Sequence, residues 1–265
     1  MKHYVQILSW IGGLLLLTSC SDKYVVSGTS SVQELDGKKL YLKMVDKNKL
    51  VNIDSSEVVH GSFKFIGLMD STMMVNLFMD DQSIMPVVLE PGGTIVVEIK
   101  DSEQKVSGTP LNNKLYDFIA KRNRIDNSIN ELPQKQSQMI MEGVPETDIQ
   151  LRLAKEQKEL LQRLDELETS FITNNFNNVL APGVFMIMTS GYQYPIMTPQ
   201  IEDIMSKAND RFKNDPYVKD YIKTAEENMR LMQAMPPAGS PEMGIPPGTP
   251  PPPPENGTQV IPPQD

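Results

Sequence analysis

The hydrophobic pattern of the first part of the chain has the short period of β-strands. In Ser62-Phe-Lys-Phe, for example, apolar and polar residues alternate, which places one face of a strand in a core and the other in water. Gly, Pro, Asp and Asn residues, which favour turns, separate six such runs. We predict strands at residues 24–28, 39–44, 62–67, 73–79, 85–89 and 94–100. Because no helical pattern lies between them, this spacing predicts an antiparallel sandwich or small barrel.

After residue 109 the pattern changes to the period of an α-helix. Apolar residues recur every three or four positions from Leu111, and we expect this helix to continue to about Leu132, where Pro133 would stop it. Thr198-Pro199 and Asp215-Pro216 are typical helix starts, with a capping side chain followed by proline at the first helical position. Further helices are predicted at about 145–178, 183–189, 198–209 and 215–232.

The longest predicted helix carries one apolar stripe. The stripe consists of Leu153, Leu160, Leu164, Leu167 and Phe171. Lys155 with Glu159, and Glu159 with Arg163, are spaced for i,i+4 ion pairs on the wetter side. Such a stripe is compatible with a coiled-coil seam for a partner, but it covers little more than two heptads. We therefore predict that it packs within this chain.

The last thirty residues have no periodicity. Twelve of the 21 prolines fall between Pro236 and Pro263, and Pro250 to Pro254 are consecutive, so we expect a disordered tail of polyproline II character. The predicted organisation is a signal peptide at 1–19, a β-domain at 20–109, a helical domain at 110–235 and a tail at 236–265. The predicted fold class is α+β, with an N-terminal antiparallel sandwich or barrel followed by helices.

The N-terminus has the features of a lipoprotein signal. Lys2 precedes a mostly apolar run from Tyr4 to Leu17, which is shorter than the about 20 residues of a membrane-spanning helix. Leu17-Thr-Ser-Cys20 matches the lipobox pattern, which implies cleavage before Cys20 and acyl chains, such as palmitate, on that residue. The alternatives are an uncleaved anchor helix and an ordinary secretory signal with an incidental cysteine. We predict a lipid-anchored protein of the cell envelope, in the outer membrane and facing the periplasm or the surface.

Charge and cysteine content exclude several classes of function. A net charge of −9 argues against nucleic acid as a partner, because phosphate binding needs a basic face and no segment supplies one. With one cysteine, the chain cannot form an internal disulfide, a CxxC redox pair or a cysteine-based zinc site.

Five segments together carry a family resemblance. They are 24–29, 37–42, 53–67, 89–93 and 106–112, and their order and spacing resemble the DUF4369 domain of envelope lipoproteins over residues 23 to 113. The helical part is similar to the segment that follows this domain in its relatives, at Phe171-Ile-Thr-Asn-Asn and Asp215-Pro-Tyr. In many relatives a thioredoxin-like domain with a CxxC motif comes next. Here the proline-rich tail stands in its place, so the resemblance implies no thiol-disulfide activity.

No group of residues in the sequence predicts catalysis, a cofactor or a metal. His60, in a predicted turn, has no nucleophile or carboxylate placed beside it, and we expect it to be solvated. Met139-Ile-Met141 and Met186-Ile-Met188 have the form of copper(I) ligands, but they lie in apolar stretches where methionine fills core space. Asp80-Asp81 is expected in a solvated hairpin turn, and Asp70-Ser-Thr72 is a short possible O-glycosylation acceptor. The aromatic side chains on which a glycan could stack are mainly Tyr192 and Tyr194, which we expect in an exposed turn.

We expect a non-catalytic, lipid-anchored binding or scaffolding protein, with the membrane and an envelope protein as its partners. One alternative is an accessory subunit of a thioredoxin-fold oxidoreductase system, in which another chain supplies the missing domain. A third hypothesis is capture of glycan or peptide at the cell surface.

Overall fold

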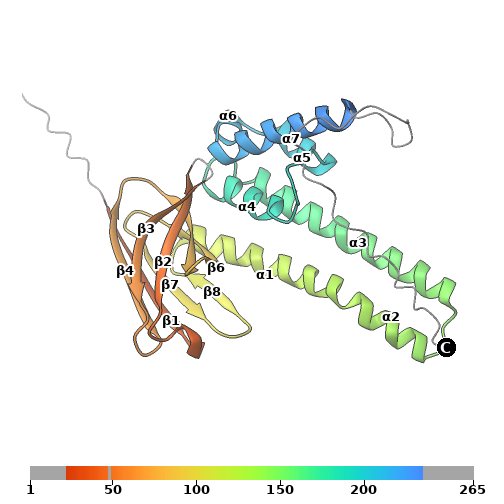
Figure 1. Ribbon diagram of the computed structural model, residues 1–265, viewed down its shortest axis with the longest axis horizontal. Helices are drawn as coiled ribbons and strands as arrows, with labels where there is room; N and C mark the ends of the chain where they lie inside the picture. Colours follow the sequence, from red (N-terminus) through yellow and green to blue (C-terminus); the bar gives the residue numbers. More distant parts are fainter. Residues whose placement is uncertain (1–21, 47–48, 235–265) are drawn as a thin grey trace, which may run out of the picture.

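The computed structural model of the protein describes residues 22–46 and 49–234. Cys20 and the predicted tail at 236–265 therefore lie outside the described residues. Two four-stranded sheets come first and helices follow, as predicted (Figure 1). Within the described ranges, no helix is long and apolar enough to span a membrane.

The two sheets form a β-sandwich. One sheet has the strand order β4-β1-β7-β8, and the other has the order β3-β2-β5-β6. Buried side chains of both sheets, such as Phe65 and Leu77, fill the space between them. The strands are β1 (Asp22–Ser30), β2 (Lys39–Asp46), β3 (Lys49–Glu57), β4 (Ser62–Met69), β5 (Met73–Met79), β6 (Gln82–Leu89), β7 (Thr94–Ile99) and β8 (Gln104–Ser107), with a 3₁₀ turn at Gln33–Leu35.

All six predicted strands are confirmed, but the sequence pattern missed β3 and β8. No residue of β3 is fully buried, and Ile53 is its one residue that packs against the main core, so the strand has no alternating apolar pattern. It is held by its antiparallel pairing with β2, from Lys39 opposite Glu57 to Asp46 opposite Lys49. β8 has four residues, of which only Val106 is buried. Backbone pairing is the main feature that defines both strands, and side-chain patterns do not report it.

The predicted antiparallel sandwich is confirmed, with one pair of strands that runs parallel. β1 runs parallel to β7, from Val25 opposite Thr94 to Ser30 opposite Ile99, whereas the other pairs are antiparallel. A parallel pair needs a long crossover connection. Here that crossover contains β2 to β6, of which β4 pairs with β1 in the first sheet and the other four strands form the second sheet. Hydrophobic periodicity carries no information about this pairing.

The first three helices form a long arm that projects from the sandwich (Figure 1). The helices are α1 (Pro110–Asn130), α2 (Leu132–Met141), α3 (Glu146–Thr173), α4 (Leu180–Thr189), α5 (Pro199–Lys207), α6 (Asp210–Lys213) and α7 (Pro216–Ala234). Pro133 does follow the end of α1, but it also lies in the first turn of α2, where a missing N–H donor costs nothing. α2 and the four-residue α6 were not predicted, and α3 ends at Thr173 rather than near residue 178.

The apolar stripe of α3 packs within the chain, as predicted. Leu160 is buried against Ile125 of α1 and Leu132 of α2, and Leu153, Leu164 and Leu167 pack around them. On the outer side, Lys155 and Glu159 form the expected ion pair at 3.9 Å. The stripe therefore holds α3 against α1 and α2.

Specific hydrogen bonds fix the helix starts and attach the helices to the sandwich. Thr198 Oγ1 accepts from the N–H of Ile201 at 3.2 Å, and Asp215 Oδ1 accepts from the N–H of Tyr217 at 3.0 Å, as their capping roles predict. The side chain of Asn112 in α1 is fully buried and bonds both backbone groups of Val88 in β6. The main hydrophobic cluster runs without interruption from Tyr24 in β1 to Ala225 in α7, so sandwich and helices share one core.

Candidate functional site

A cavity of about 240 Å³ lies where the sandwich meets α4 and α7. Its apolar wall includes Met44, Met73 and Met74 from the sandwich, Met186 and Ile187 from α4, and Tyr217 from α7. Thr72, Asn76 and Asp215 supply the polar groups at its edge. Four thioether side chains from three elements thus line one space.

Close contact between α4 and β5 shapes this cavity. At Gly183 a side chain would overlap Met74, since an added Cβ would lie 2.0 Å from the Met74 sulfur. At the other side, Tyr217 Oη and Thr189 Oγ1 lie 2.8 Å apart and share a hydrogen bond. The Thr189 hydroxyl also donates to the Phe185 carbonyl at 2.8 Å, which fixes the α7 tyrosine against α4.

The cavity suits a small apolar group. Methionine side chains are unbranched and polarizable, so they adapt to ligands of different shape. Sites for drug-sized molecules occupy about 300–1,000 Å³, so this cavity matches one apolar side chain or a short aliphatic segment rather than a larger molecule.

The two Met-x-Met segments lie in different environments. Met188 is buried in the core as predicted, and Met186 is half-buried at the cavity. For Met141 the prediction of a core position is wrong, since 81% of this residue is exposed at the end of α2. α2 ends at the tip of the arm, away from the main core of the described residues (Figure 1). Among the described residues, no group of three or more His, Cys, Asp or Glu side chains could hold a metal ion.

The remaining candidate residues of the sequence are scattered. His60 is exposed in a turn with a φ of 51°, and the neighbouring Gly61 N–H donates to Asp36 Oδ1 at 3.1 Å. Asp80 and Asp81 are exposed in the β5–β6 turn as expected, and Lys43 Nζ donates to the Asp80 carbonyl at 2.8 Å. Asp70 and Ser71 are exposed, so the predicted sites do not converge on one place.

The tyrosine pair expected in an exposed turn is only partly exposed. Tyr194 is 46% exposed, but Tyr192 is half-buried and packs against the main core. Burial raises the pKa of the Tyr192 hydroxyl. One of the two aromatic surfaces considered for glycan binding is therefore used in packing.

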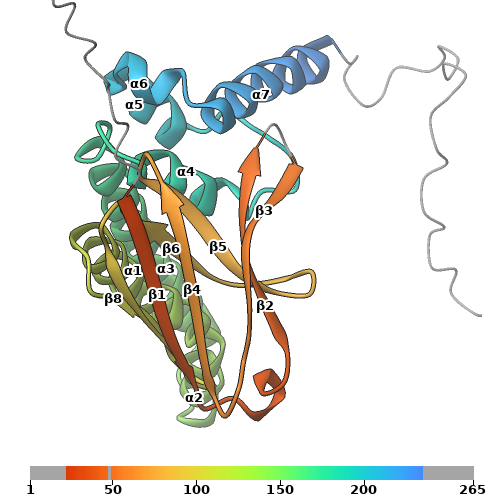
Figure 2. The ribbon, with the colours of Figure 1, turned by 90° about the vertical axis from the view of Figure 1, so that its left-hand side faces the viewer.

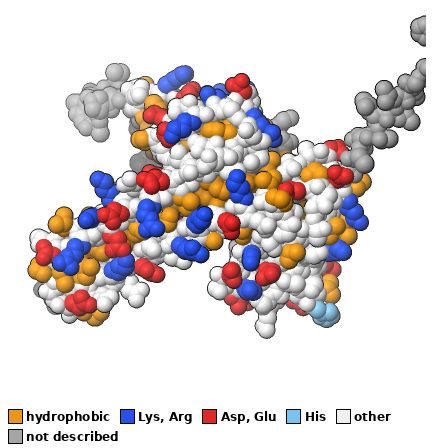
Figure 3. Space-filling model, turned by 180° about the vertical axis from the view of Figure 1, so that it is seen from behind, with side chains coloured by type: hydrophobic (Ala, Val, Ile, Leu, Met, Phe, Trp, Pro, Cys, Tyr) orange, Lys and Arg blue, Asp and Glu red, His pale blue; other side chains and the backbone are white. Residues whose placement is uncertain are grey.

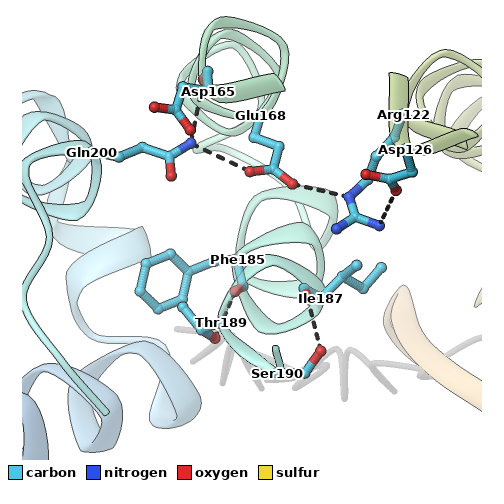
Figure 4. A network of polar contacts seen from close by, with 9 residues as sticks. All are labelled: Arg122, Asp126, Asp165, Glu168, Phe185, Ile187, Thr189, Ser190 and Gln200. Carbon is cyan, nitrogen blue, oxygen red and sulfur yellow. Dashed lines mark hydrogen bonds and ion pairs between the residues drawn. The ribbon is translucent and has the colours of Figure 1, made fainter. Parts of the chain in front are cut away.

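A polar network around the buried Glu168 joins two helices of the arm to each other and to α5. Glu168 of α3 is 4% exposed; its Oε1 accepts from Arg122 Nε at 3.0 Å and its Oε2 accepts from Gln200 Nε2 at 3.3 Å (Figure 4). Arg122 also pairs with Asp126 at 3.0 Å. Burial raises the pKa of Glu168, while Arg122 and Gln200 oppose that rise. These polar groups find their hydrogen-bond and ion-pair partners in one another, which is typical of a structural network.

A second polar link lies inside the sandwich. The hydroxyl of Tyr24 donates to Asp54 Oδ2 at 3.1 Å and so connects the two sheets. Burial, together with the Asp54 carboxylate, raises the pKa of Tyr24 to about 12. This tyrosine is therefore neutral at physiological pH and acts as a hydrogen-bond donor.

The structure also brings together positively charged side chains that are far apart in the sequence. An open groove of about 850 Å³ runs between α1 and α3, with Leu160 and Phe171 among its apolar lining. Its cationic side chains are Lys114, Lys121, Arg124 and Arg163, beside one carboxylate, Glu166. Figure 3 shows Lys and Arg side chains on both sides of an apolar strip along the arm. Two helices that are far apart in sequence, α1 and α3, form this groove together, so no segment by itself predicts its cationic lining.

Comparison with known proteins identifies the β-region. Residues 24–115 match the model of the domain of unknown function DUF4369. The sandwich is a DUF4369 domain. No curated protein matches the chain. The DUF4369 match includes all of β2 to β8 and the first residues of α1, so Met44, Met73 and Met74 belong to this domain. Met186 and Tyr217 lie beyond it, and the cavity is therefore built at the junction between the DUF4369 domain and the helices that follow.

Proposed function

We propose that this protein is a non-catalytic binding module of the cell envelope, anchored by lipid on Cys20, and that its methionine-lined cavity holds an apolar side chain of a protein partner. The observation that carries the proposal is the cavity itself, with four methionines at the junction of the DUF4369 domain and the helices. Interfaces commonly place one anchoring side chain in such a pocket.

The state of the buried polar groups supports a non-catalytic role. Among the described residues, every buried side-chain nitrogen or oxygen has a hydrogen-bond partner. Asn112, Glu168 and Thr189, for instance, bond to backbone or side-chain groups that hold helices in place. Active sites usually keep polar groups poised for a substrate, often with strongly perturbed pKa values in a cleft.

Site-specific crosslinking tests the binding role of the cavity. We expect p-benzoylphenylalanine in place of Thr72, at the cavity edge, to form a discrete crosslinked product with one envelope protein in intact cells. A second substitution, Ile187→Trp, should fill the cavity and remove that product. The readout is immunoblotting and mass spectrometry of the crosslinked band.

The matched control places the same photoreactive residue at Gln157, which is exposed on the arm away from the cavity. Circular dichroism should show that Ile187→Trp leaves the protein folded. Identical products from positions 72 and 157, or a product that survives Ile187→Trp in a folded protein, would refute the cavity as the binding site.

The lipid anchor is tested separately at its single cysteine. Cys20→Ala should abolish incorporation of a fatty-acid probe and release the protein from the membrane fraction, because each buried CH₂ of an acyl chain contributes about 0.8 kcal/mol to membrane binding. A Cys20→Ala protein that still takes up the probe would show that the lipobox prediction is wrong.

A further inference from the structure

The predicted lipid anchor lies next to the first strand of the sandwich. β1 begins at Asp22, so only Ser21 separates it from Cys20. Two Cα–Cα steps of about 3.8 Å allow at most about 8 Å between the Cα atoms of Cys20 and Asp22. A lipid on Cys20 would therefore hold the start of β1 at the bilayer surface.

Exposed aliphatic side chains gather at this same end of the sandwich. Asp22 pairs with Met69 and Lys23 pairs with Leu68, so the end of β4 lies beside the start of β1. Leu68 is 71% exposed, and Ile66, two residues earlier on the same face, is 48% exposed. These are the outward-facing positions of a strand whose inward positions, such as Phe65, are buried.

The β2–β3 hairpin carries a second pair of exposed aliphatic residues. Leu50 is 54% exposed and Val51 is 40% exposed, and they pair with Val45 and Met44 near the end of β2. Figure 2 shows that the start of β1, the end of β4, the end of β2 and the start of β3 lie toward the same end of the sandwich. Lys23 and Lys49 stand beside the two apolar pairs, where ammonium groups can meet lipid phosphates.

We infer that this end of the DUF4369 domain is a membrane-contact surface, on which Leu68 and Leu50 enter the lipid interface beside the anchor. The inference rests on the proposed lipid at Cys20 and adds a direct contact between the folded domain and the bilayer. Isolated exposed leucines are common, but these two lie at the one end of the domain that an eight-ångström tether holds against lipid.

The same orientation directs the helical arm away from the membrane. In Figure 2 the end of the arm at α2 lies opposite the start of β1. α3 alone has 28 residues and spans about 42 Å, so Leu151 near the tip stands far from the lipid. Leu151 is 73% exposed, almost the same as Leu68, and provides a matched control.

Tryptophan fluorescence tests this inference. The only tryptophan, Trp10, lies in the predicted signal peptide, so a mature variant carries one engineered reporter. The lipidated full-length mature protein with Leu68→Trp is reconstituted in phosphatidylcholine vesicles with brominated or unbrominated acyl chains. We expect blue-shifted emission and strong quenching by the brominated lipid for Leu68→Trp and Leu50→Trp, and no quenching for Leu151→Trp.

Vesicle flotation tests the lipid anchor separately from the membrane-contact surface. Protein that floats while Leu68→Trp and Leu50→Trp remain unquenched would overturn the membrane-contact surface and leave the lipid anchor standing. Protein that does not float would overturn the anchor and the contact surface together. Equal quenching at position 151 would also overturn the inference, because it would place the arm on the membrane.

Discussion

Replacing Asn112 with alanine is expected to lower the free energy of unfolding by roughly 3 kcal/mol. The amide is fully buried; its Oδ1 accepts from the N–H of Val88 at 2.9 Å, and its Nδ2 donates to the Val88 carbonyl at 2.7 Å. Alanine would leave both backbone groups of β6 without a partner, and a buried unsatisfied group costs about 1–3 kcal/mol. For a protein of this size the melting temperature should fall by about 6–12 °C.

The neighbouring Asn113 provides the control for this prediction. It is exposed in the same helical turn, so Asn113→Ala should change the free energy of unfolding by less than about 0.5 kcal/mol. Asn112→Asp keeps an acceptor for the Val88 N–H but loses the donor to the Val88 carbonyl, and it should also destabilise. Equal denaturant midpoints for the 112 and 113 alanine variants would show that the amide does not hold α1 to the sandwich.

Arg122→Ala is expected to destabilise the protein by about 2–4 kcal/mol, because it leaves the Glu168 carboxylate buried without its cation. Breaking a fully buried pair costs about 3–5 kcal/mol. The smaller value applies here since 28% of the Arg122 side chain is exposed, against 5% for Glu168. Chemical denaturation at neutral pH measures the loss. Lys155→Ala, which removes an exposed pair, should cost less than about 0.5 kcal/mol.

The loss of folding stability caused by Arg122→Ala should be smaller at acidic pH than at neutral pH. Burial already raises the pKa of Glu168 above its ordinary value of 4.5, and removal of Arg122 takes away the contributions that lower it. The folded variant therefore binds a proton more tightly than the unfolded chain, and a raised carboxyl pKa means that stability falls as pH rises through it. The variant should come closest to the wild type as the pH falls toward 4.5. A penalty independent of pH would show that lost packing, not the buried charge, is responsible.

A double replacement tests whether apolar packing can replace the ion pair of Arg122 and Glu168 in stabilising the protein. Arg122→Met with Glu168→Leu removes both charges and fills the space with apolar side chains, which is often neutral for stability. We expect most of the stability lost in Arg122→Ala to return. If the double variant remains as unstable as Arg122→Ala, the Gln200 contact of Glu168 also contributes to holding α5 in place.

Patterns of single segments predicted the elements that have a buried face. The strands of residues 62–69 and 73–79, the α3 stripe and the caps at Thr198 and Asp215 could all be predicted, because burial on one face imposes a period and a helix start requires a capping acceptor. β3 could not be predicted, since none of its residues is fully buried and its pairing with β2 leaves no regular side-chain pattern. The DUF4369 resemblance at 23 to 113 came from motif order and agrees with the match at 24–115.

The sequence by itself determined the fold class, the position of the period change at Pro110 and the candidate lipidation residue, since each depends on residues close together in the chain. Only the tertiary structure decided which distant residues meet. It paired β1 with β7, brought Met44, Met74 and Met186 around one cavity, and placed Leu68 beside Lys23 at the start of β1. Contacts between distant segments depend on how whole elements pack, and local periodicity records only whether a residue is buried, not which residue covers it.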